Sequence, residues 1–387
     1  MGFLQTDEAL ARHCCYADTA PLPAPAPTLQ GSEEADVAVV GGGLAGLSAA
    51  IELAQRGLRV SLLEARRIGW GPSGRNGGQV IAGLACDMAT IEAQLGHTAA
   101  RAVWDGTLEA IDIIHQRCAQ HGIDAQWQPG FINVAVNARK GRALQHSVAR
   151  MAERYGHLQR WIPPEQMRQW VDSPAYHSGA YDARSGHLHP RKYTLGLARA
   201  AAGLGVAIHE DTAVTALTPG ARPVLHTAQG RITARQVLLA GNVYLQGLAP
   251  VLARRIMPVG TYIVASAPVD PALAQRLIPC GAAVCDNNVV LDYFRFSADH
   301  RMVYGGRVSY STATPMNLAD SMRGRMVGTF PQLAGTPVTH AWGGFVDISM
   351  NRAPDFGRLP GCPQVYYLQG FSGHGLALTG LAGRWHC

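Results

Sequence analysis

The sequence predicts an α/β protein in which one doubly wound domain is interrupted twice by a second domain that is richer in strands. The length of 387 residues favours two domains, because single hydrophobic cores stop growing near about 250 to 300 residues. A strand, a glycine-rich turn and a helix follow one another near the start of the chain and again near its end. Hydrophobic residues make up 47% of the chain and charged residues 16%, which is typical of a compact folded protein.

The first strand–turn–helix–strand unit is "ADVAVVGGGLAGLSAAIELAQRGLRVSLLEARR", residues 35 to 67. Within such a unit the pattern G-x-G-x-x-G is the fingerprint of a Rossmann-type dinucleotide site. Gly41 permits the sharp turn, Gly43 lets a pyrophosphate approach the backbone, and Gly46 lets the helix pack closely on the strand. The alternative, a glycine-rich turn without a ligand, does not explain the second strand and the acidic residue that ends it.

That acidic residue is Glu64, which is placed to accept hydrogen bonds from the hydroxyls of an adenosine ribose. An acidic side chain there disfavours a 2′-phosphate, so the predicted ligand is FAD or NAD and not NADP. Ala65 and Arg66 follow it, while Leu44 and Ala45 open the helix whose N-terminus faces the phosphates. We expect these five residues to line the dinucleotide.

The segment "GWGPSGRNGGQ", residues 69 to 79, has no periodic apolar face and begins five residues after the predicted ribose contact. Its serine, arginine and asparagine supply polar donors, and its paired glycines let the main chain lie against a flat ring. A solvent loop that happens to be rich in glycine is the alternative. The cofactor contacts predicted in this loop are Ser73, Arg75, Asn76, Gly77, Gly78 and Gln79.

The rest of the chain divides into segments whose residue patterns predict different kinds of structure. Residues 20 to 35 are rich in proline and alanine and predict an extended strap, and residues 88 to 121 have helical spacing. After residue 125, strands dominate, with a further helix near residues 317 to 330. The predicted organisation is an N-terminal arm (1–34), a discontinuous cofactor domain (35–122, 187–255 and 340–387) and an α+β substrate domain with a mixed or antiparallel sheet (123–186 and 256–339).

Near the C-terminus, "YYLQGFSGHGLALTGLAGR" reads as a strand, a glycine-rich turn and a helix of small residues. A second helix N-terminus is thereby expected at the cofactor, where its dipole stabilises negative charge on a reduced flavin ring. An ordinary strand-to-helix turn is the alternative. The helix is short, so we expect a truncated terminus that weakens flavin binding.

Composition excludes several classes of function. The net charge of +6 comes from scattered basic residues, so we expect no nucleic-acid partner. No run of about 18 apolar residues occurs, so we expect no membrane segment. The eight cysteines have neither C-x-x-C nor zinc spacing, so we expect no metal and a reducing, cytoplasmic location.

Together these motifs resemble those of the FAD-dependent amine and amino-acid oxidoreductases of the D-amino-acid-oxidase type, over residues 13 to 384. "SGRNGGQ", "SGHLHP" and "WGGFVDISMNRAPDFG" are similar to the narrower group that acts on gamma-glutamylputrescine-like primary amines in polyamine catabolism. The resemblance implies an FAD cofactor, which we expect to be non-covalent because no cysteine lies between residues 286 and 361. It also implies cofactor contacts at Val214, Ala240, Gly241, Gly373, His374, Gly375 and Leu376.

The resemblance further implies oxidative deamination: a hydride leaves the amine-bearing carbon for flavin N5, and water hydrolyses the imine to an aldehyde and ammonia. Dioxygen or another acceptor then takes up the electrons. Relatives that oxidise amino acids carry an arginine for the substrate carboxylate in a G-x-R-P-type stretch, where this chain has Gly344, Phe345, Val346 and Asp347. The arginine is therefore missing, and an acidic side chain lies nearby instead, which suits a cationic amine. Tyr262, Tyr293 and Trp342 are expected to cage the alkylamine or to be core aromatics. Asp347 either orients the amine or caps a turn, and His374 either shapes the cofactor site or carries a proton.

Three alternatives stay open. The first is an N-demethylating secondary-amine or amino-acid oxidase of the sarcosine- or glycine-oxidase kind. The second is a C-terminally truncated flavoprotein with impaired FAD binding and no activity, and the third is a nicotinamide dehydrogenase. The sequence leaves the particular amine, the electron acceptor and the oligomeric state open.

Overall fold

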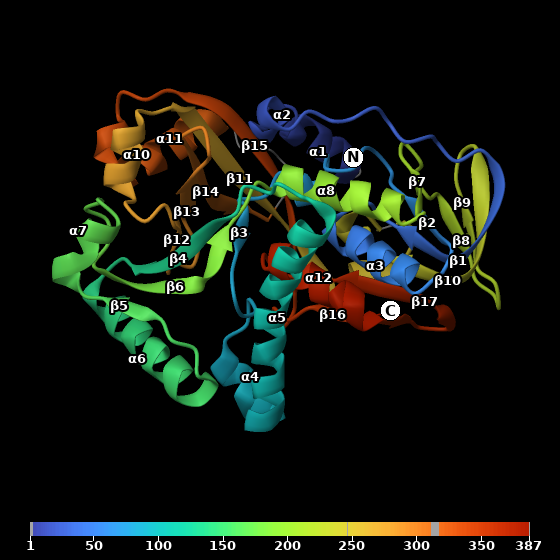
Figure 1. Cartoon of the computed structure of the whole chain (residues 1–387), viewed down its shortest axis with the longest axis horizontal. Helices are drawn as coiled ribbons and strands as arrows, with labels where there is room; N and C mark the ends of the chain where they lie inside the picture. The colour runs from blue at the N-terminus through green and yellow to red at the C-terminus, as the bar shows by residue number, and fades with distance from the viewer. Residues whose placement is uncertain (1–2, 246, 311–316, 387) are drawn as a thin grey trace.

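The computed structural model describes residues 3–245, 247–310 and 317–386. It contains two large sheets, one on each side of the molecule, each flanked by helices (Figure 1). The predicted α/β fold, with a Rossmann-type domain and a second domain built on a mixed sheet, is confirmed.

The first sheet carries the dinucleotide-type unit. Its strand order is β16-β17-β10-β1-β2-β7, and β1, β2, β7, β10 and β17 pair in parallel. The helices α3, α5, α8 and α12 share one hydrophobic core on one face of this sheet. The bounds are β1 (Gly31–Val40), β2 (Val60–Leu63), β7 (Ala207–His209), β8 (Ala216–Thr218), β9 (Val224–His226), β10 (Gly230–Leu239), β16 (Asp355–Leu359), β17 (Cys362–Gln369), α3 (Leu44–Gln55), α5 (His97–His121), α8 (Pro190–Gly203) and α12 (Gly375–His386).

The second sheet has the order β15-β11-β14-β13-β12-β4-β6-β3, with β5 added beside β6. Its neighbours are antiparallel except for the parallel pair β4 and β12. The bounds are β3 (Gln79–Val80), β4 (Gln128–Ala135), β5 (Arg160–Ile162), β6 (Ser178–His187), β11 (Ile256–Pro268), β12 (Ala283–Asp286), β13 (Tyr293–Phe296), β14 (Arg301–Ser309), β15 (Val338–Ser349), α4 (Met88–Leu95), α6 (Ala138–Tyr155), α7 (Met167–Trp170), α9 (Pro250–Ala253), α10 (Pro271–Leu277) and α11 (Leu318–Thr329).

The unit β1-α3-β2 forms as the periodicity predicts. The second half of β1 is almost wholly buried, and α3 buries nearly every residue because it lies between the sheet and α12. Gly41 has a φ of 109°, which favours glycine, and it starts the turn. A Cβ on Gly46 would lie 2.0 Å from the carbonyl oxygen of Gly41. The close crossing of helix and strand therefore requires a glycine there.

The single helix predicted over residues 88 to 121 is two helices in the structure, α4 and α5. The helical pattern from 88 to 121 is interrupted at Gly96, whose φ of 78° is left-handed. Gly96 ends α4 and begins α5, because a glycine at this conformation lets the chain change direction between two helices. Periodicity alone did not reveal the break, since both helices place apolar residues toward the same side.

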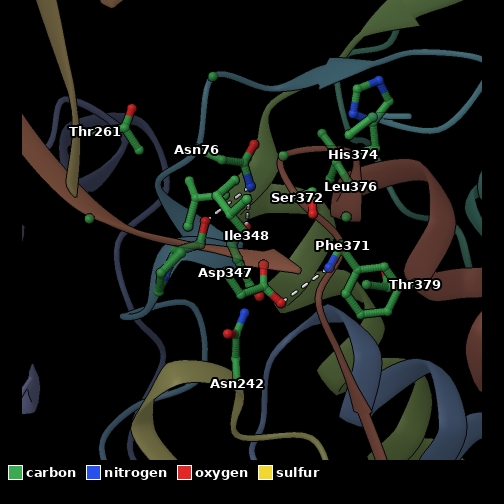
Figure 2. Close-up of a pocket in the computed structure, with 18 of the residues that line it drawn as sticks. Asn76, Asn242, Thr261, Asp347, Ile348, Phe371, Ser372, His374, Leu376 and Thr379 are labelled. Atoms are coloured by element: carbon green, nitrogen blue, oxygen red, sulfur yellow. Dashed lines mark hydrogen bonds between the residues drawn. The ribbon is translucent and has the colours of Figure 1, made fainter. Parts of the chain in front are cut away.

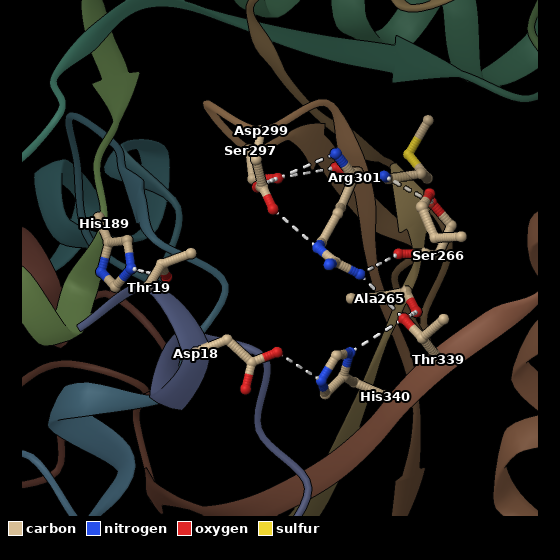
Figure 3. A network of polar contacts seen from close by, with 12 residues as sticks. Asp18, Thr19, His189, Ala265, Ser266, Ser297, Asp299, Arg301, Thr339 and His340 are labelled. Atoms are coloured by element: carbon tan, nitrogen blue, oxygen red, sulfur yellow. Dashed lines mark hydrogen bonds and ion pairs between the residues drawn. The ribbon is translucent and has the colours of Figure 1, made fainter. Parts of the chain in front are cut away.

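The N-terminal arm is more than the predicted extended strap. It contains α1 (Phe3–Ala11) and α2 (Tyr16–Thr19) before an extended segment leads into β1. Asp18 pairs with Nε2 of His340 at 3.0 Å, and the hydroxyl of Thr19 lies 2.8 Å from Nε2 of His189 (Figure 3). The arm thus contacts β15 of the second sheet and the segment that begins α8 of the first domain.

The proposed domain boundaries differ from the sheets at two places. Residues 79 to 80 and 340 to 349 were assigned to the cofactor domain, whereas β3 and β15 pair in the second sheet. Both strands lie where the chain passes from one domain to the other. Among the described residues, no helix combines the length and the hydropathy needed to cross a membrane.

Candidate functional site

A cavity of about 1260 Å³ lies between the two sheets and is lined by both domains. The N-terminus of α3, the loop of residues 69 to 79 and the turn before α12 all form part of its wall. This volume exceeds the roughly 300 to 1,000 Å³ of most small-molecule sites. The cavity therefore has room for an extended ligand together with a second molecule.

Most of the predicted site residues meet at this cavity, although they come from eight separate parts of the chain. The predicted residues on its wall are Gly41, Gly43, Leu44, Ala45, Glu64, Ala65, Ser73, Arg75, Asn76, Gly77, Gln79, Val214, Ala240, Gly241, Tyr293, Asp347, Gly373, His374, Gly375 and Leu376.

Five predicted residues are not on the wall. Gly46 lies beneath α3 against Gly41, and the position of Gly78 is backed by the carbonyl of Leu188. The Arg66 side chain turns away to Glu8, 2.5 Å distant, and Arg67 lines the cavity in its place. The other two, Tyr262 and Trp342, are described below.

At the α3 end, Glu64 is held by the backbone. Its two carboxylate oxygens accept hydrogen bonds from the N–H groups of Gly42, at 2.7 Å, and Arg66, at 2.9 Å. Burial raises the pKa of Glu64, while these two N–H groups lower it. Both contacts fix the carboxylate at the end of β2, beside the turn that begins α3. This is the place that the ribose prediction requires.

Replacing Glu64 by glutamine is expected to weaken FAD binding about tenfold to a hundredfold. Hydrogen bonds to a charged acceptor contribute about 1.5 to 3 kcal/mol, and the glutamine amide would also direct an N–H toward one of the two backbone donors. The dissociation constant for FAD, measured by fluorescence quenching, tests this. An Asp36→Asn variant, altered in the middle of β1 and away from the cavity wall, serves as control. Unchanged affinity in the Glu64 variant would contradict the ribose assignment.

The loop of residues 69 to 79 reaches the start of α3. The hydroxyl oxygen of Ser73 accepts a hydrogen bond from the N–H of Leu44 at 3.0 Å. Asn76 closes its own turn, because its Nδ2 donates to the carbonyls of Pro72 and Ser73 and its Oδ1 accepts from Gly78. The loop therefore has a defined shape without regular structure.

Arg75 has a structural role in addition to the predicted one. It lines the cavity, but its Nε donates to the carbonyl of Trp70 and its two terminal nitrogens donate to Gly343 and to the buried carboxylate of Asp7. These bonds use three of the five N–H donors of the guanidinium, so each terminal nitrogen keeps one N–H. Arg75 therefore positions the loop, and its predicted contact with the cofactor stays a prediction.

At the α12 end, Asp347 holds the turn that precedes the helix. Its Oδ2 accepts hydrogen bonds from the N–H groups of Gly370 and Phe371, and its carbonyl accepts from Ser372 at 3.0 Å (Figure 2). Burial raises the pKa of Asp347 to about 6, although these backbone N–H groups lower it. Of the two predicted roles, the geometry favours capping of the local turn.

Asp347 should make stability depend on pH. Because its folded pKa of about 6 is raised, its stabilising effect is complete below about pH 4 and is lost as the pH rises through 6. The loss amounts to up to about 3 kcal/mol, at 1.36 kcal/mol per pKa unit. An Asp347→Asn variant lacks this titration. The free energy of unfolding of wild type minus variant should therefore fall between pH 4 and 7, and a constant difference would contradict the assignment.

His374 lies half-buried in the same wall. Burial lowers its pKa to about 4, so the imidazole is neutral near pH 7. Its Nδ1 is buried and has no hydrogen-bond partner within the part of the chain that the structure describes. A neutral ring with an unpaired nitrogen suits a residue that shapes a binding site by hydrogen bonding.

The predicted aromatic cage is incomplete. Tyr293 lines the cavity, with its hydroxyl 3.4 Å from that of Thr261. Tyr262 is buried on the opposite face of β11, because side chains alternate along a strand and its neighbours Thr261 and Ile263 line the cavity. Trp342 is also buried away from the cavity, and its indole N–H donates to the carbonyl of Arg75 at 2.7 Å. Both are core aromatics, which was the stated alternative.

The cavity also contains residues that sequence reasoning missed. Cys285, on β12, lies beside Tyr293, and burial raises the pKa of its thiol, so the group stays protonated. The other missed residues are Trp104, Asn133, His157, Asp182, Arg307 and Arg352. No local pattern marks them, because they come from separate helices, strands and loops.

The residues present fit an FAD molecule. Two helix N-termini, of α3 and α12, meet one long cavity, and His374 adds an unpaired buried nitrogen. Helix N-termini stabilise anionic groups such as a pyrophosphate. The acidic side chain at the end of β2 and the glycine turn before α3 would hold the adenosine end of the FAD molecule.

Comparisons with known proteins agree with this geometry. The family described as FAD dependent oxidoreductase (DAO) matches residues 36 to 387. The chain is 39% identical to the gamma-glutamylputrescine oxidoreductase of Escherichia coli K12, over 95% of this chain and 86% of that protein. It is 38% identical to the probable oxidoreductase OrdL of Haemophilus influenzae, over 92% and 83%.

Among solved structures, glycine oxidase from Geobacillus kaustophilus shares the fold, with a TM-score of 0.77 at 21% identity, covering 91% of this chain and 93% of that one. The family match spans both sheets and the whole cavity wall from α3 to α12. The chain therefore belongs to the FAD-dependent oxidoreductases of the DAO family, and it is an FAD-dependent enzyme.

Proposed function

We propose that the protein oxidises a primary amine of the gamma-glutamylputrescine kind to an aldehyde and ammonia, in polyamine catabolism. The observation that carries the proposal is the wall that the second sheet presents to the cavity. Near β11 and β15 this wall presents seven uncharged side chains, and it has no arginine in the stretch from 344 to 347, where amino-acid oxidases of the family hold a carboxylate. The two charged side chains nearby, Asp347 and Arg307, bond the turn before α12 and the hydroxyl of Ser321. The wall residues are Val259, Thr261, Ile263, Tyr293, Val308, Phe345 and Val346.

A neutral wall favours the reactive form of the substrate. Taking an ammonium out of water disfavours its charged form, so the amine binds with its nitrogen lone pair available. The lone pair assists loss of hydride from the adjacent carbon, which leaves an imine that water hydrolyses. FAD, when bound, supplies the two-electron acceptor for this hydride. No side chain has to act as a base.

The chain's own groups stabilise the charge that develops. The N-terminus of α12 lines the cavity, and its dipole favours negative charge there. The turn that precedes α12 is held in place by Asp347, and His374 remains neutral beside it. Asp347 thus supports catalysis by positioning a helix terminus, without contact with the amine.

Anaerobic mixing with a panel of amines tests the proposal. Loss of flavin absorbance is expected to be fastest with gamma-glutamylputrescine, slower with putrescine, and slowest with sarcosine and D-alanine. Faster reduction by sarcosine or D-alanine would overturn the proposal, as would no reduction by any amine. Repeating the reaction with dioxygen and with an artificial acceptor separates an oxidase from a dehydrogenase.

One observation favours the second candidate, a secondary-amine or amino-acid oxidase. Arg307, at the end of β14, lines the cavity, although its Nη1 donates to the hydroxyl of Ser321 at 2.7 Å. An arginine there could bind a substrate carboxylate that the missing family arginine would otherwise bind. An Arg307→Met variant that loses activity on sarcosine and keeps activity on gamma-glutamylputrescine would assign Arg307 to this minor activity.

A further inference from the structure

The cavity continues past the neutral wall into a polar end within the second domain. Four side chains define this end, which we call the head pocket: Trp104 of α5, Asn133 of β4, His157 before β5, and Asp182 of β6. Trp104, His157 and Asp182 are 5%, 5% and 2% exposed, so the pocket is well shielded from solvent.

Contacts within the head pocket hold an ionised carboxylate. Oδ2 of Asp182 accepts a hydrogen bond from the hydroxyl of Ser185 at 2.6 Å, and it lies 3.4 Å from Nε2 of His157. Burial raises the pKa of Asp182, but the nearby imidazole of His157 and the hydrogen bond from Ser185 outweigh burial and hold the pKa below the ordinary range. The ring of His157 meets that of Trp104 edge-on, with centroids 4.9 Å apart.

Besides Nε2 of His157, which only approaches the carboxylate of Asp182 at 3.4 Å, two polar atoms of the head pocket have no hydrogen-bond partner among the described residues. They are the indole nitrogen Nε1 of Trp104, which is a donor, and the amide oxygen Oδ1 of Asn133, which is an acceptor. Buried polar atoms of folded proteins are nearly always hydrogen-bonded, and an unpaired one costs stability. One unpaired donor and one unpaired acceptor beside a carboxylate point to a ligand that carries both kinds of group.

The strand order of the second sheet gives the distance between the head pocket and Tyr293 on the wall where the amine is proposed to react. Tyr293 on β13 pairs with Cys285 on β12, which pairs with Asn133 on β4, and β6 with Asp182 lies next. Three strand spacings of about 4.8 Å separate β13 from β6, or about 14 Å. An extended chain advances roughly 1.2 Å per bond, so about ten bonds span most of this distance.

We propose that the head pocket binds the far end of the substrate: a head with an ammonium and a carboxylate, joined through an amide and about ten bonds to the amine that is oxidised. The assignment rests on the proposed amine oxidation. The ammonium bonds Oδ1 of Asn133 and is balanced by Asp182, and the carboxylate accepts from Nε1 of Trp104. Glycine and sarcosine are too short to reach from the wall to this pocket, so the pocket selects long amines.

A ligand that has the head but cannot react tests the pocket separately from catalysis. Gamma-glutamyl-n-butylamide keeps the amino-acid head, the amide and the chain, and lacks the terminal amine. Isothermal titration calorimetry with FAD-loaded protein should show binding. N-butylacetamide, which has the amide without the head, should bind at least tenfold more weakly. Since neither ligand is oxidised, these results do not depend on the flavin reduction that tests the proposed function.

Two substitutions remove the unpaired atoms. Asn133→Leu and Trp104→Phe delete groups that have no hydrogen bond in the protein, so folding should change little, and each is expected to weaken gamma-glutamyl-n-butylamide binding about tenfold. Trp127→Phe is the matched control, because Trp127 also packs edge-on against a histidine, His115, but does not line the cavity.

The outcomes are distinct. Weaker binding in both variants with an unchanged control supports the head pocket. No binding to the wild type, equal binding of the two ligands, or equal affinity in all variants would overturn it. Reduction of the flavin by gamma-glutamylputrescine together with any of these results would leave the proposed oxidation intact and place the substrate's far end elsewhere.

Discussion

An Asp7→Ala variant is expected to lose about 3 to 5 kcal/mol of unfolding free energy and to be purified with less FAD than the wild type. Asp7 lies in α1 of the N-terminal arm and is fully buried. Its carboxylate pairs with Arg75, which is 3% exposed in the cofactor loop, and also accepts a hydrogen bond from the hydroxyl of Tyr244. One side chain of the arm therefore fastens two parts of the cavity wall.

The size of this effect follows from what remains after the substitution. Removing one partner of a buried ion pair leaves an uncompensated charge, here the guanidinium of Arg75, in a shielded place. The loop of residues 69 to 79 would then shift so that this charge reaches water, and the contact of Ser73 with α3 would be lost with it. Urea unfolding and the ratio of flavin to protein absorbance measure the two losses.

Asp18 offers a matched control within the same arm. It pairs with His340, but its side chain is 55% exposed and it does not line the cavity (Figure 3). Exposed pairs contribute only about 0 to 1 kcal/mol, so Asp18→Ala should retain stability and flavin. Similar losses in both variants would show that the arm acts only as general packing, and would refute a specific role for Asp7.

A Gly46→Ala variant should be destabilised by about 3 kcal/mol or more and should bind FAD poorly. The added Cβ would lie 2.0 Å from the backbone oxygen of Gly41 and 3.2 Å from a side-chain carbon of Val39. Backbone cannot rotate aside as a flexible side chain can, so α3 must move away from β1. The helix N-terminus would then leave the position at which it faces the cavity.

A glycine-to-alanine substitution in α11 should instead raise the free energy of unfolding. Gly324 lies in the interior of this helix, and a Cβ there would meet nothing within 4 Å. Gly324→Ala is thus expected to stabilise by about 0.5 to 1 kcal/mol, because alanine has the higher helix propensity. Thermal unfolding and FAD titration of both variants test the pair. A Gly46→Ala protein with normal stability would mean that helix and strand do not cross as closely as described.

Local sequence patterns were enough to predict a large part of the cofactor domain. The unit β1-α3-β2, the glycine turn at Gly41 and the strand and helix at the C-terminus were predicted from periodicity and spacing, because each depends on contacts within a few residues. Glu64 was found in the same way, as the acidic residue that ends the second strand. The FAD-dependent family follows from these motifs.

Tertiary structure decided the rest, since those features depend on contacts between distant residues. Arg75 was predicted to contact the cofactor, and only the fold revealed its second partner, Asp7, which lies 68 residues away in the sequence. Tyr262 looked like a cage residue until the pairing of β11 showed which face it occupies. The head pocket joins one helix, two strands and a loop that no spacing connects. Short-range patterns report local conformation, whereas the packing of the sheets determines which side chains share a cavity.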